Sequence, residues 1–575
     1  MNPYSESRFV GFVSMVSPLQ TKVHFPSSVL LKKFFNAEKG YQAITGKYIV
    51  IEGTGVGFLG KITEISLPEK ERLELTEAKF EKEIFHPTGK VEILLCFDNY
   101  KLKAKKGLDQ LPPVSAKVYL CSDEFLGSLL TEFGVKDGVK PITIPLASLP
   151  DNENHKIDVS SQALFGRHCA IVGTTGGGKS WTVAKLIEQV VAQNGKAILI
   201  DATGEYGTLK STNIEYYKFN NVSDDGIYFN YKKLRETDLF ALFRPSQQSQ
   251  LPKLQEAFKS LRLVEILKTK KIEIGDAVDA KIMSDFYKKN IEHDYTTLIK
   301  KGFKEDLNFL SSCKNNPKVY SNNCEFDIKA LSSQILNECI FDNGSEDRTA
   351  KNNCQSLISR ILLTTNDKSF LNVFDFRNEL NALCKNEFEN VFNKFIVNKS
   401  NVLILSVSNV STENKLREIL VNSIGRFLLE KALNEQFKAV TKKSLLLFLD
   451  EAHLFLNKKI KDEYSIEVEL DAFDRIAKEC RKFGLFLVIS TQMPRDIPRG
   501  VLSQMGTFIV HRLINQQDRE AIEFACSDAN KSALSFLPIL SSGEAMLTGV
   551  DFPMPMILKI RKPNIEPNSN TPNVF

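Results

Sequence analysis

The stretch from Ile171 to Val190 reads IVGTTGGGKSWTVAKLIEQV, and the interpretation of the whole chain starts from it. Residues 173–180 fit the pattern G-x-x-x-x-G-K-[ST], which joins an apolar strand to the start of a helix. Apolar residues precede Gly173, and apolar residues at helical spacing follow Ser180. The stretch therefore predicts a phosphate-binding loop between a strand and a helix.

Each part of this loop has a physical role in holding the phosphates of a nucleotide. Glycines let successive backbone N–H groups converge on phosphate oxygens, and the helix N-terminus adds a favourable dipole. Lys179 is expected to reach the β- and γ-phosphates, and the Ser180 hydroxyl is expected to ligate Mg²⁺, so we expect ATP and Mg²⁺ as cofactors. The predicted nucleotide contacts are Gly173, Thr174, Thr175, Gly176, Gly177, Gly178, Lys179, Ser180 and Trp181.

Two further strand ends carry polar groups suited to hydrolysis. The stretch KSLLLFLDEAH delivers Asp450 and Glu451 to the carboxyl end of an apolar strand, where open α/β sheets bind ligands. Asp450 is expected to bind Mg²⁺ through water, and Glu451 is expected to act as general base on the attacking water. The strand LFLVISTQ ends at Gln492, whose amide is a candidate sensor of the γ-phosphate; an ordinary polar strand end is the alternative.

The pattern of apolar residues along the chain changes near residue 150. Short alternating segments between Phe9 and Leu146 predict a small all-β barrel or sandwich, and PLASLPDNENHK reads as a linker. Glycines at positions 55, 57 and 60 match the dinucleotide fingerprint, but LGKITEISL continues as a strand, so a β-turn is favoured. Buried strands alternating with helices then predict an α/β fold with a parallel sheet. Its expected core strands are 169–172, 197–201, 402–407, 445–450 and 485–490.

These patterns give a division into four parts. The predicted parts are a β domain at 1–150, an α/β ATPase core at 151–236 and 396–560, a helical insertion at 237–395 and a mobile tail at 561–575.

Bulk properties exclude several classes of protein. The 575 residues are 42% hydrophobic and 25% charged, the balance of a soluble globular protein. A net charge of +5 is too small to argue for nucleic acid by itself. The ten cysteines are scattered singly, no apolar run could span a bilayer, and the N-terminus lacks a signal-peptide pattern. We therefore expect a cytoplasmic protein that does not bind membranes.

With these motifs in order, most of the chain resembles the HerA-type ATPases of the HerA and FtsK group. The matching pieces are GRHCAIVGTTGGGKS, DATGEYG, LDEAHLF, RIAKECRKFG, STQMPRDIPRGVLSQ, VHRLINQQD and GEAMLTGVDFPMPMILKI. The resemblance implies a RecA-like core, an N-terminal barrel and a homo-hexameric ring around double-stranded DNA. Contacts to DNA would go to phosphates without reading sequence, and the basic stretch NKKIK at 457–461 is a candidate loop or a solvated turn.

The resemblance also implies roles for further charged residues. A ring with each nucleotide at a subunit boundary would need a cation supplied in trans, and Arg167, Arg481 and Arg512 are the candidates. Asp201 and Glu205 follow the second core strand, where a role around Mg²⁺ or water and a capping role are both open. No separate function is assigned to His453 or His511.

The preferred hypothesis is an ATP-driven translocase of double-stranded DNA that works with a separate nuclease or Sir2-type effector, in bacterial antiviral defence. A DNA-end-resection motor paired with a NurA-type nuclease is one alternative. A second is a nucleotide-regulated ring scaffold that activates its effector without processive movement. A soluble secretion ATPase shares the core motifs and is a third.

Overall fold

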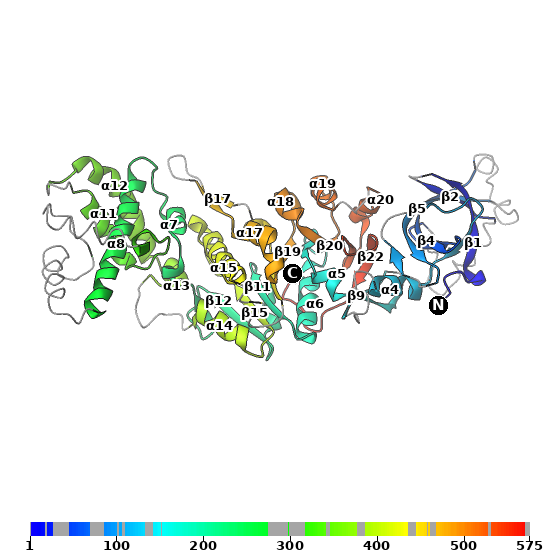
Figure 1. Ribbon diagram of the computed structural model, residues 1–575, viewed down its shortest axis with the longest axis horizontal. Helices are drawn as coiled ribbons and strands as arrows, with labels where there is room; N and C mark the ends of the chain where they lie inside the picture. The colour runs from blue at the N-terminus through cyan, green and yellow to red at the C-terminus, as the bar shows by residue number, and fades with distance from the viewer. Residues whose placement is uncertain are drawn as a thin grey trace, which may run out of the picture. The chain divides into compact units, whose positions relative to one another are not determined.

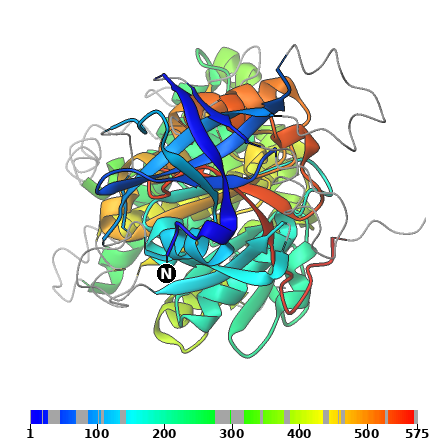
Figure 2. The same ribbon diagram turned by 90° about the vertical axis from the view of Figure 1, so that its right-hand side faces the viewer.

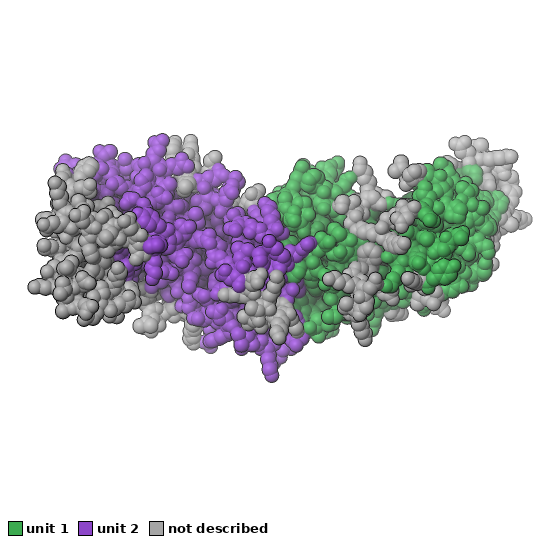
Figure 3. Space-filling model, viewed as in Figure 1, with its two compact units in different colours: residues 1–193, 486–566 green, residues 194–485, 567–575 purple. Residues whose placement is uncertain are grey.

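The computed structural model of the protein separates into two compact units (Figure 3). Unit 1 comprises residues 1–193 and 486–566, and unit 2 comprises residues 194–485 and 567–575. The residues that the structure describes are 2–17, 20–26, 45–68, 86–100, 103–105, 110–132, 142–150, 152–273, 297, 317–340, 345–376, 386–434, 437, 444–456, 458–460, 467–526 and 531–569.

The N-terminal part of unit 1 is a closed β-barrel (Figures 1 and 2, blue). Its strands follow the order β2-β1-β7-β3-β4-β5, and β2 also pairs with β5, which closes the ring. Alternate side chains point inward and form an apolar core that includes Val10, Phe25 and Ile62. The strands are β1 Phe9–Val16, β2 Thr21–His24, β3 Tyr48–Ile51, β4 Val56–Ser66, β5 Thr88–Asp98 and β7 Lys117–Leu120.

The structure confirms the predicted β-barrel, but the prediction of β structure alone up to Leu146 is wrong, because the helix α4, Asp123–Glu132, follows β7. Strand β4 contains Gly57 and Gly60 and pairs with β3 and β5 along its length. Gly57 and Gly60 therefore lie within a strand and not in the predicted turn, and, as predicted, they open no helix.

The second sheet region of unit 1 has the order β19-β10-β20-β21-β22-β8-β9. Strand β10 is parallel to both β19 and β20, whereas the pairs from β20 to β9 are antiparallel. Helix α6, Lys179–Ala192, follows β10 and packs against it. The strands are β8 Thr143–Leu149, β9 Asn152–Ser160, β10 His168–Val172, β19 Leu485–Thr491, β20 Met505–His511, β21 Glu544–Gly549 and β22 Met556–Ile560.

The prediction that PLASLPDNENHK forms a linker is wrong. This stretch forms the hairpin of β8 and β9, which extends the second sheet region. Strand β9 is the last in the order and therefore has only one strand neighbour, so its polar residues reach solvent. That polarity resembles the composition of a linker, which explains the error.

The sheet of unit 2 has the order β14-β13-β12-β15-β11-β16 and is parallel throughout. Its central strands are fully buried and apolar, as expected when both faces are covered. The five predicted core strands are confirmed to within a residue at either end, whereas β12 and β13 were not predicted. The bounds are β11 Lys196–Asp201, β12 Ile214–Phe219, β13 Gly226–Tyr228, β14 Asn386–Glu387, β15 Val402–Ser406 and β16 Leu445–Leu449.

Helices dominate the described part of the predicted insertion (Figure 1, green). Where its last helix ends, Lys196 Nζ donates hydrogen bonds to the carbonyls of Phe395, Asn398 and Ser400, at 2.7, 2.8 and 2.6 Å. One lysine on β11 thus satisfies three carbonyls at the end of the insertion. The helices are α7 Glu236–Phe243, α8 Gln250–Glu273, α11 Leu331–Glu338, α12 Arg348–Asn366, α13 Lys368–Phe374 and α14 Phe388–Val397.

The C-terminal segment makes contacts that its composition did not predict. Arg561 N donates to Leu146 O at 3.0 Å, and Asn564 N donates to Glu188 Oε2 at 2.7 Å. Residues 570–575 of the predicted mobile tail lie outside the described residues. Over the described part of the chain, no helix has the length and apolar character to cross a membrane.

Candidate nucleotide and hydrolysis site

The phosphate loop leaves the carboxyl end of β10 and enters α6 at Lys179. Gly176 and Gly178 have φ values of +73° and +109°, a region that glycine adopts without a steric cost. Thr174 N donates to Arg512 O at 3.0 Å, which ties the loop to the end of β20. The predicted strand, loop and helix are thus present, with the loop between the carboxyl end of β10 and the N-terminus of α6.

Two functional side chains reach the loop within unit 1. Lys179 is buried, and its Nζ donates to Thr174 O at 3.0 Å. Gln492 follows β19, and its Oε1 accepts a hydrogen bond of 2.6 Å from Thr175 Oγ1. The predicted sensor amide therefore lies against the loop.

The first turn of α6 carries the other predicted contacts of the loop. Ser180 and Trp181 are both half-buried, so part of each side chain remains accessible. The Nζ of Lys562 lies 5.2 Å from the centre of the Trp181 ring, a cation–π contact with the C-terminal segment.

Carboxylates gather at the strand ends of unit 2. Asp201 ends β11 and is fully buried, and its Oδ1 accepts hydrogen bonds from the backbone of Thr203 and Gly204 at 3.2 and 2.7 Å. Its Oδ2 has no hydrogen-bond partner among the described residues. Burial raises the pKa of Asp201, and the Gly204 N–H opposes that shift. Thr203 Oγ1 lies 3.5 Å from both Asp201 Oδ1 and Asp450 Oδ2.

This donor set fits a magnesium ion. Hard carboxylate oxygens and hydroxyls are the ligands that Mg²⁺ prefers, and an unsatisfied buried oxygen on Asp201 leaves capacity for a cation or its water.

Glu205 begins the short helix η2, Glu205–Leu209, and its backbone oxygen accepts a 2.8 Å bond from Asn568 N.

Glu451 is held in a backbone conformation unusual for its type. Its φ is +45° and ψ +49°, the left-handed region that costs a non-glycine residue free energy. The side chain is buried, and His453 Nδ1 lies 3.2 Å from its Oε2. The turn after β16 thus positions a carboxylate beside an imidazole, a contact that the sequence did not reveal.

The three candidate arginines differ in their surroundings. Arg167 Nε donates to Asp551 Oδ2 at 2.9 Å, and its stem packs on Gly506. Arg481 and Arg512 are exposed, and neither side chain has an ion pair or hydrogen bond with the described residues. Arg167 is therefore engaged within its own chain, whereas the other two are available.

The predicted basic loop is partly neutralised. Residues 458–460 form strand β17, which pairs with β18, Val468–Leu470. Lys459 Nζ contacts the carboxylates of Glu467 and Glu469 at 2.8 and 2.7 Å. Positions 457 and 461 of the NKKIK stretch lie outside the described residues.

His511 is a residue whose place at the site the sequence did not indicate. It ends β20, is fully buried, and its Nε2 lies 2.8 Å from Thr182 Oγ1 on α6. A Cβ on Gly173 would come within 2.5 Å of the His511 Cβ. The histidine therefore packs directly under the phosphate loop.

Comparison with known families accounts for this arrangement. The family model for the central domain of helicase HerA matches residues 144–384, and the model for the HerA-like C-terminal region matches residues 429–553. The chain belongs to the HerA family. The HerA matches include the phosphate loop, the Asp450–Glu451 pair and Gln492, so the chain is an ATP-hydrolysing enzyme with a P-loop fold.

Relatives of the HerA family align over most of the chain. The DNA double-strand break repair helicase HerA of Sulfolobus acidocaldarius is 25% identical over 543 residues, 92% of this chain and 91% of that protein. The probable helicase MJECL08 of Methanocaldococcus jannaschii is 24% identical over 461 residues, 78% of this chain and 74% of that protein. Among solved structures, VirB4 of Thermoanaerobacter pseudethanolicus has 15% identity and a TM-score of 0.44, over 74% of this chain and 98% of its own.

Proposed function

We propose that the chain is a DNA translocase of the helicase class, driven by ATP and Mg²⁺. The observation that carries the proposal is the phosphate loop with Gln492 Oε1 bonded to Thr175 Oγ1, inside a chain that matches both HerA regions. Relatives named DNA double-strand break repair helicases support DNA as the substrate. The double-stranded form and its passage through a homo-hexameric ring belong to the proposal.

The residues divide the chemistry as follows. Lys179 and the loop N–H groups would bind the β- and γ-phosphates, and Ser180 and Asp450 would hold Mg²⁺, which would supply positive charge to the phosphates. Glu451 would accept the proton of the attacking water, a contribution of about 10²- to 10⁴-fold in rate. Gln492 would orient that water, and Asp201 would contribute a carboxylate near the metal or its water.

A cation from a neighbouring copy completes the proposed site. Arg481 and Arg512 are the preferred residues, because both are exposed and neither side chain makes an ion pair with the described part of the chain. An arginine supplied in trans contributes about 10³- to 10⁵-fold in P-loop enzymes. We further propose that the ring works with a separate nuclease or Sir2-type effector in antiviral defence.

One experiment tests the motor. ATP hydrolysis and particle mass are measured in the same sample of purified chain, with and without linear double-stranded DNA, beside the Glu451→Gln variant as the inactive control. A ring of about six chains whose turnover rises with DNA length supports translocation. Turnover that ignores DNA, in a ring that still activates a bound effector, would replace the motor with a scaffold.

A specific feature favours the scaffold as second candidate. The barrel exposes apolar side chains, among them Met15 at 45% and Val114 at 61%. The barrel carries none of the proposed catalytic residues, so its exposed apolar side chains are available for contact with a partner protein.

A further inference from the structure

The side chain of His511 joins three parts of unit 1. Its Nε2 lies 2.8 Å from Thr182 Oγ1, and its Nδ1 lies 2.9 Å from Glu544 O. Thr182 stands in the first turn of α6, directly after the phosphate loop, and Glu544 begins β21. One buried ring therefore connects the helix that follows the loop to the turn at 541–544.

The partners of the ring fix its protonation. Glu544 O is a carbonyl and only accepts, so Nδ1 carries the proton and donates it. Burial lowers the pKa of His511 to about 4, and Lys179 acts in the same direction, so the ring is neutral near pH 7. A neutral Nε2 is then an acceptor for the Thr182 hydroxyl. The single proton of this hydroxyl has two acceptors within reach, His511 Nε2 at 2.8 Å and Gly178 O at 3.1 Å, so Thr182 links the ring to the phosphate loop.

The side chain of His511 also limits the space available at two glycines of the phosphate loop. A Cβ at residue 173 would lie 2.5 Å from His511 Cβ, and one at residue 178 would lie 3.3 Å from His511 Cε1. The ring thus fills the space beneath both glycines. A smaller side chain would leave a void there, because protein interiors are close-packed.

The turn at 541–544 holds the loop carbonyls. Gly543 N donates to Gly177 O at 3.2 Å, and Ser542 Oγ donates to Gly176 O at 3.1 Å. The C=O and N–H of a trans peptide unit point in opposite directions. Holding the Gly177 carbonyl at Gly543 therefore aims the Gly178 N–H away from the turn.

We infer that His511 and the turn at 541–544 are a positioning device for the phosphate loop, which orients its N–H groups toward the phosphates of the nucleotide. The inference rests on the proposed nucleotide site and adds residues that the loop motif does not contain. His511 touches no phosphate itself; it acts through Thr182, Gly173 and the Ser541–Glu544 turn.

Substitutions that separate the two bonds of the ring test this device. His511→Asn can retain the donor toward Glu544 O but loses the acceptor for Thr182. Thr182→Val removes the same bond from the other side, together with the bond from the Thr182 hydroxyl to Gly178 O. Each variant should weaken binding of Mg²⁺–ATP by about tenfold, the value of one hydrogen bond of ordinary strength. Thr182→Ser restores the hydroxyl and should restore the affinity.

Ile509→Val is the matched control for lost packing. Ile509 lies on β20 two residues before His511, is fully buried, and makes none of these loop contacts. The readouts are the dissociation constant from titration with a fluorescent ATP analogue and the midpoint of thermal unfolding of the full chain. The control should lower the midpoint and leave the dissociation constant unchanged.

Three results would overturn the inference. One is unchanged affinity in folded His511→Asn and Thr182→Val, another is equal weakening in Ile509→Val, and the third is no rescue by Thr182→Ser. If His511→Asn fails to fold, the comparison of Thr182→Val with Thr182→Ser and the variant Ser542→Ala still decide it, since Thr182→Val removes the hydroxyl contacts to His511 and Gly178 and Ser542→Ala removes the contact to Gly176 O. Failure of the proposed function looks different, because Lys179→Ala would then bind nucleotide as tightly as the unaltered chain.

Discussion

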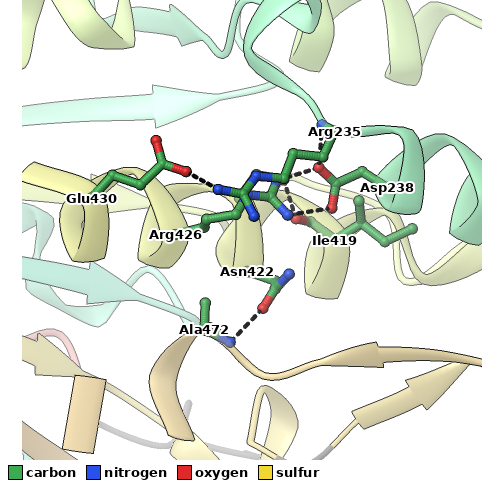
Figure 4. Close-up of polar contacts among 8 residues, drawn as sticks. Arg235, Asp238, Ile419, Asn422, Arg426, Glu430 and Ala472 are labelled. Atoms are coloured by element: carbon green, nitrogen blue, oxygen red, sulfur yellow. Dashed lines mark hydrogen bonds and ion pairs between the residues drawn. The ribbon is translucent and has the colours of Figure 1, made fainter. Parts of the chain in front are cut away.

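The buried ion pair of Asp238 and Arg426 should make this part of unit 2 sensitive to the loss of either partner (Figure 4). Asp238 on α7 is 1% exposed, and Arg426 on α15, Leu416–Leu433, is 12% exposed. Arg426 Nη1 donates to Asp238 Oδ1 at 3.0 Å, and Nη2 donates to Oδ2. The same Oδ2 accepts from Arg235 N at 2.9 Å, the capping bond of α7. The pair therefore ties the first helix of the predicted insertion to a helix of the core.

Its removal should have a measurable cost. Breaking a buried pair by deleting one partner costs about 3–5 kcal/mol, because the other charge remains buried. Asp238→Asn keeps the shape and the capping acceptor, and Arg426 retains a little solvent contact, so we expect about 3 kcal/mol. This cost corresponds to about a hundredfold rise in the equilibrium constant for local unfolding of α7 and α15. Arg426→Met should cost a similar amount.

Amide hydrogen exchange, measured by mass spectrometry, reports the local unfolding of the helices that the ion pair connects. Peptides from α7 and α15 should exchange about a hundredfold faster in each single variant, while peptides from α6 in unit 1 serve as the internal control. In the double variant Asp238→Asn with Arg426→Met the costs should be clearly less than additive. Additive costs, or single variants that change exchange less than twofold, would refute the reasoning.

Three site variants and one structural variant extend these tests. Lys179→Ala should lose nucleotide binding in an equilibrium titration with labelled ATP, and unchanged affinity would contradict its role. Glu451→Gln should bind ATP and lose at least about 10²-fold in turnover, because it removes the proton acceptor; near-normal turnover would exclude it as the base. Arg481→Ala should reduce the activity of mixed rings more than its share of subunits, whereas strictly proportional activity would show no role in trans. Lys196→Met should cost about 2 kcal/mol in exchange of peptides from α14, because three carbonyls lose a charged donor; Lys559→Met, which breaks an exposed pair with Glu153, should change little.

Sequence analysis located elements most accurately where the physical requirement on an element, such as burial of both faces of a strand, is visible in a short run of residues. The strands before Gly173 and Asp450 are buried on both faces, so they appear as continuous apolar runs and were located closely. The loop itself is recognisable from the fixed positions of its pattern, and at one of them, Gly178, the φ of +109° is a conformation that glycine adopts without a steric cost. Strand β9 was missed because an edge strand keeps polar residues that resemble those of a linker.

Sequence patterns predicted the phosphate loop and the paired carboxylates of the proposed site, and they located the parallel strands that carry these residues. Each of these features lies within a segment of about ten residues, so it can be recognised in the sequence without knowledge of the fold. The tertiary structure alone decided that His511 supports the loop across 329 positions and that Arg167 pairs with Asp551 across 384. A single histidine or arginine looks the same in sequence whether it is solvated or buried, because its role depends on partners that only folding brings within 3 Å.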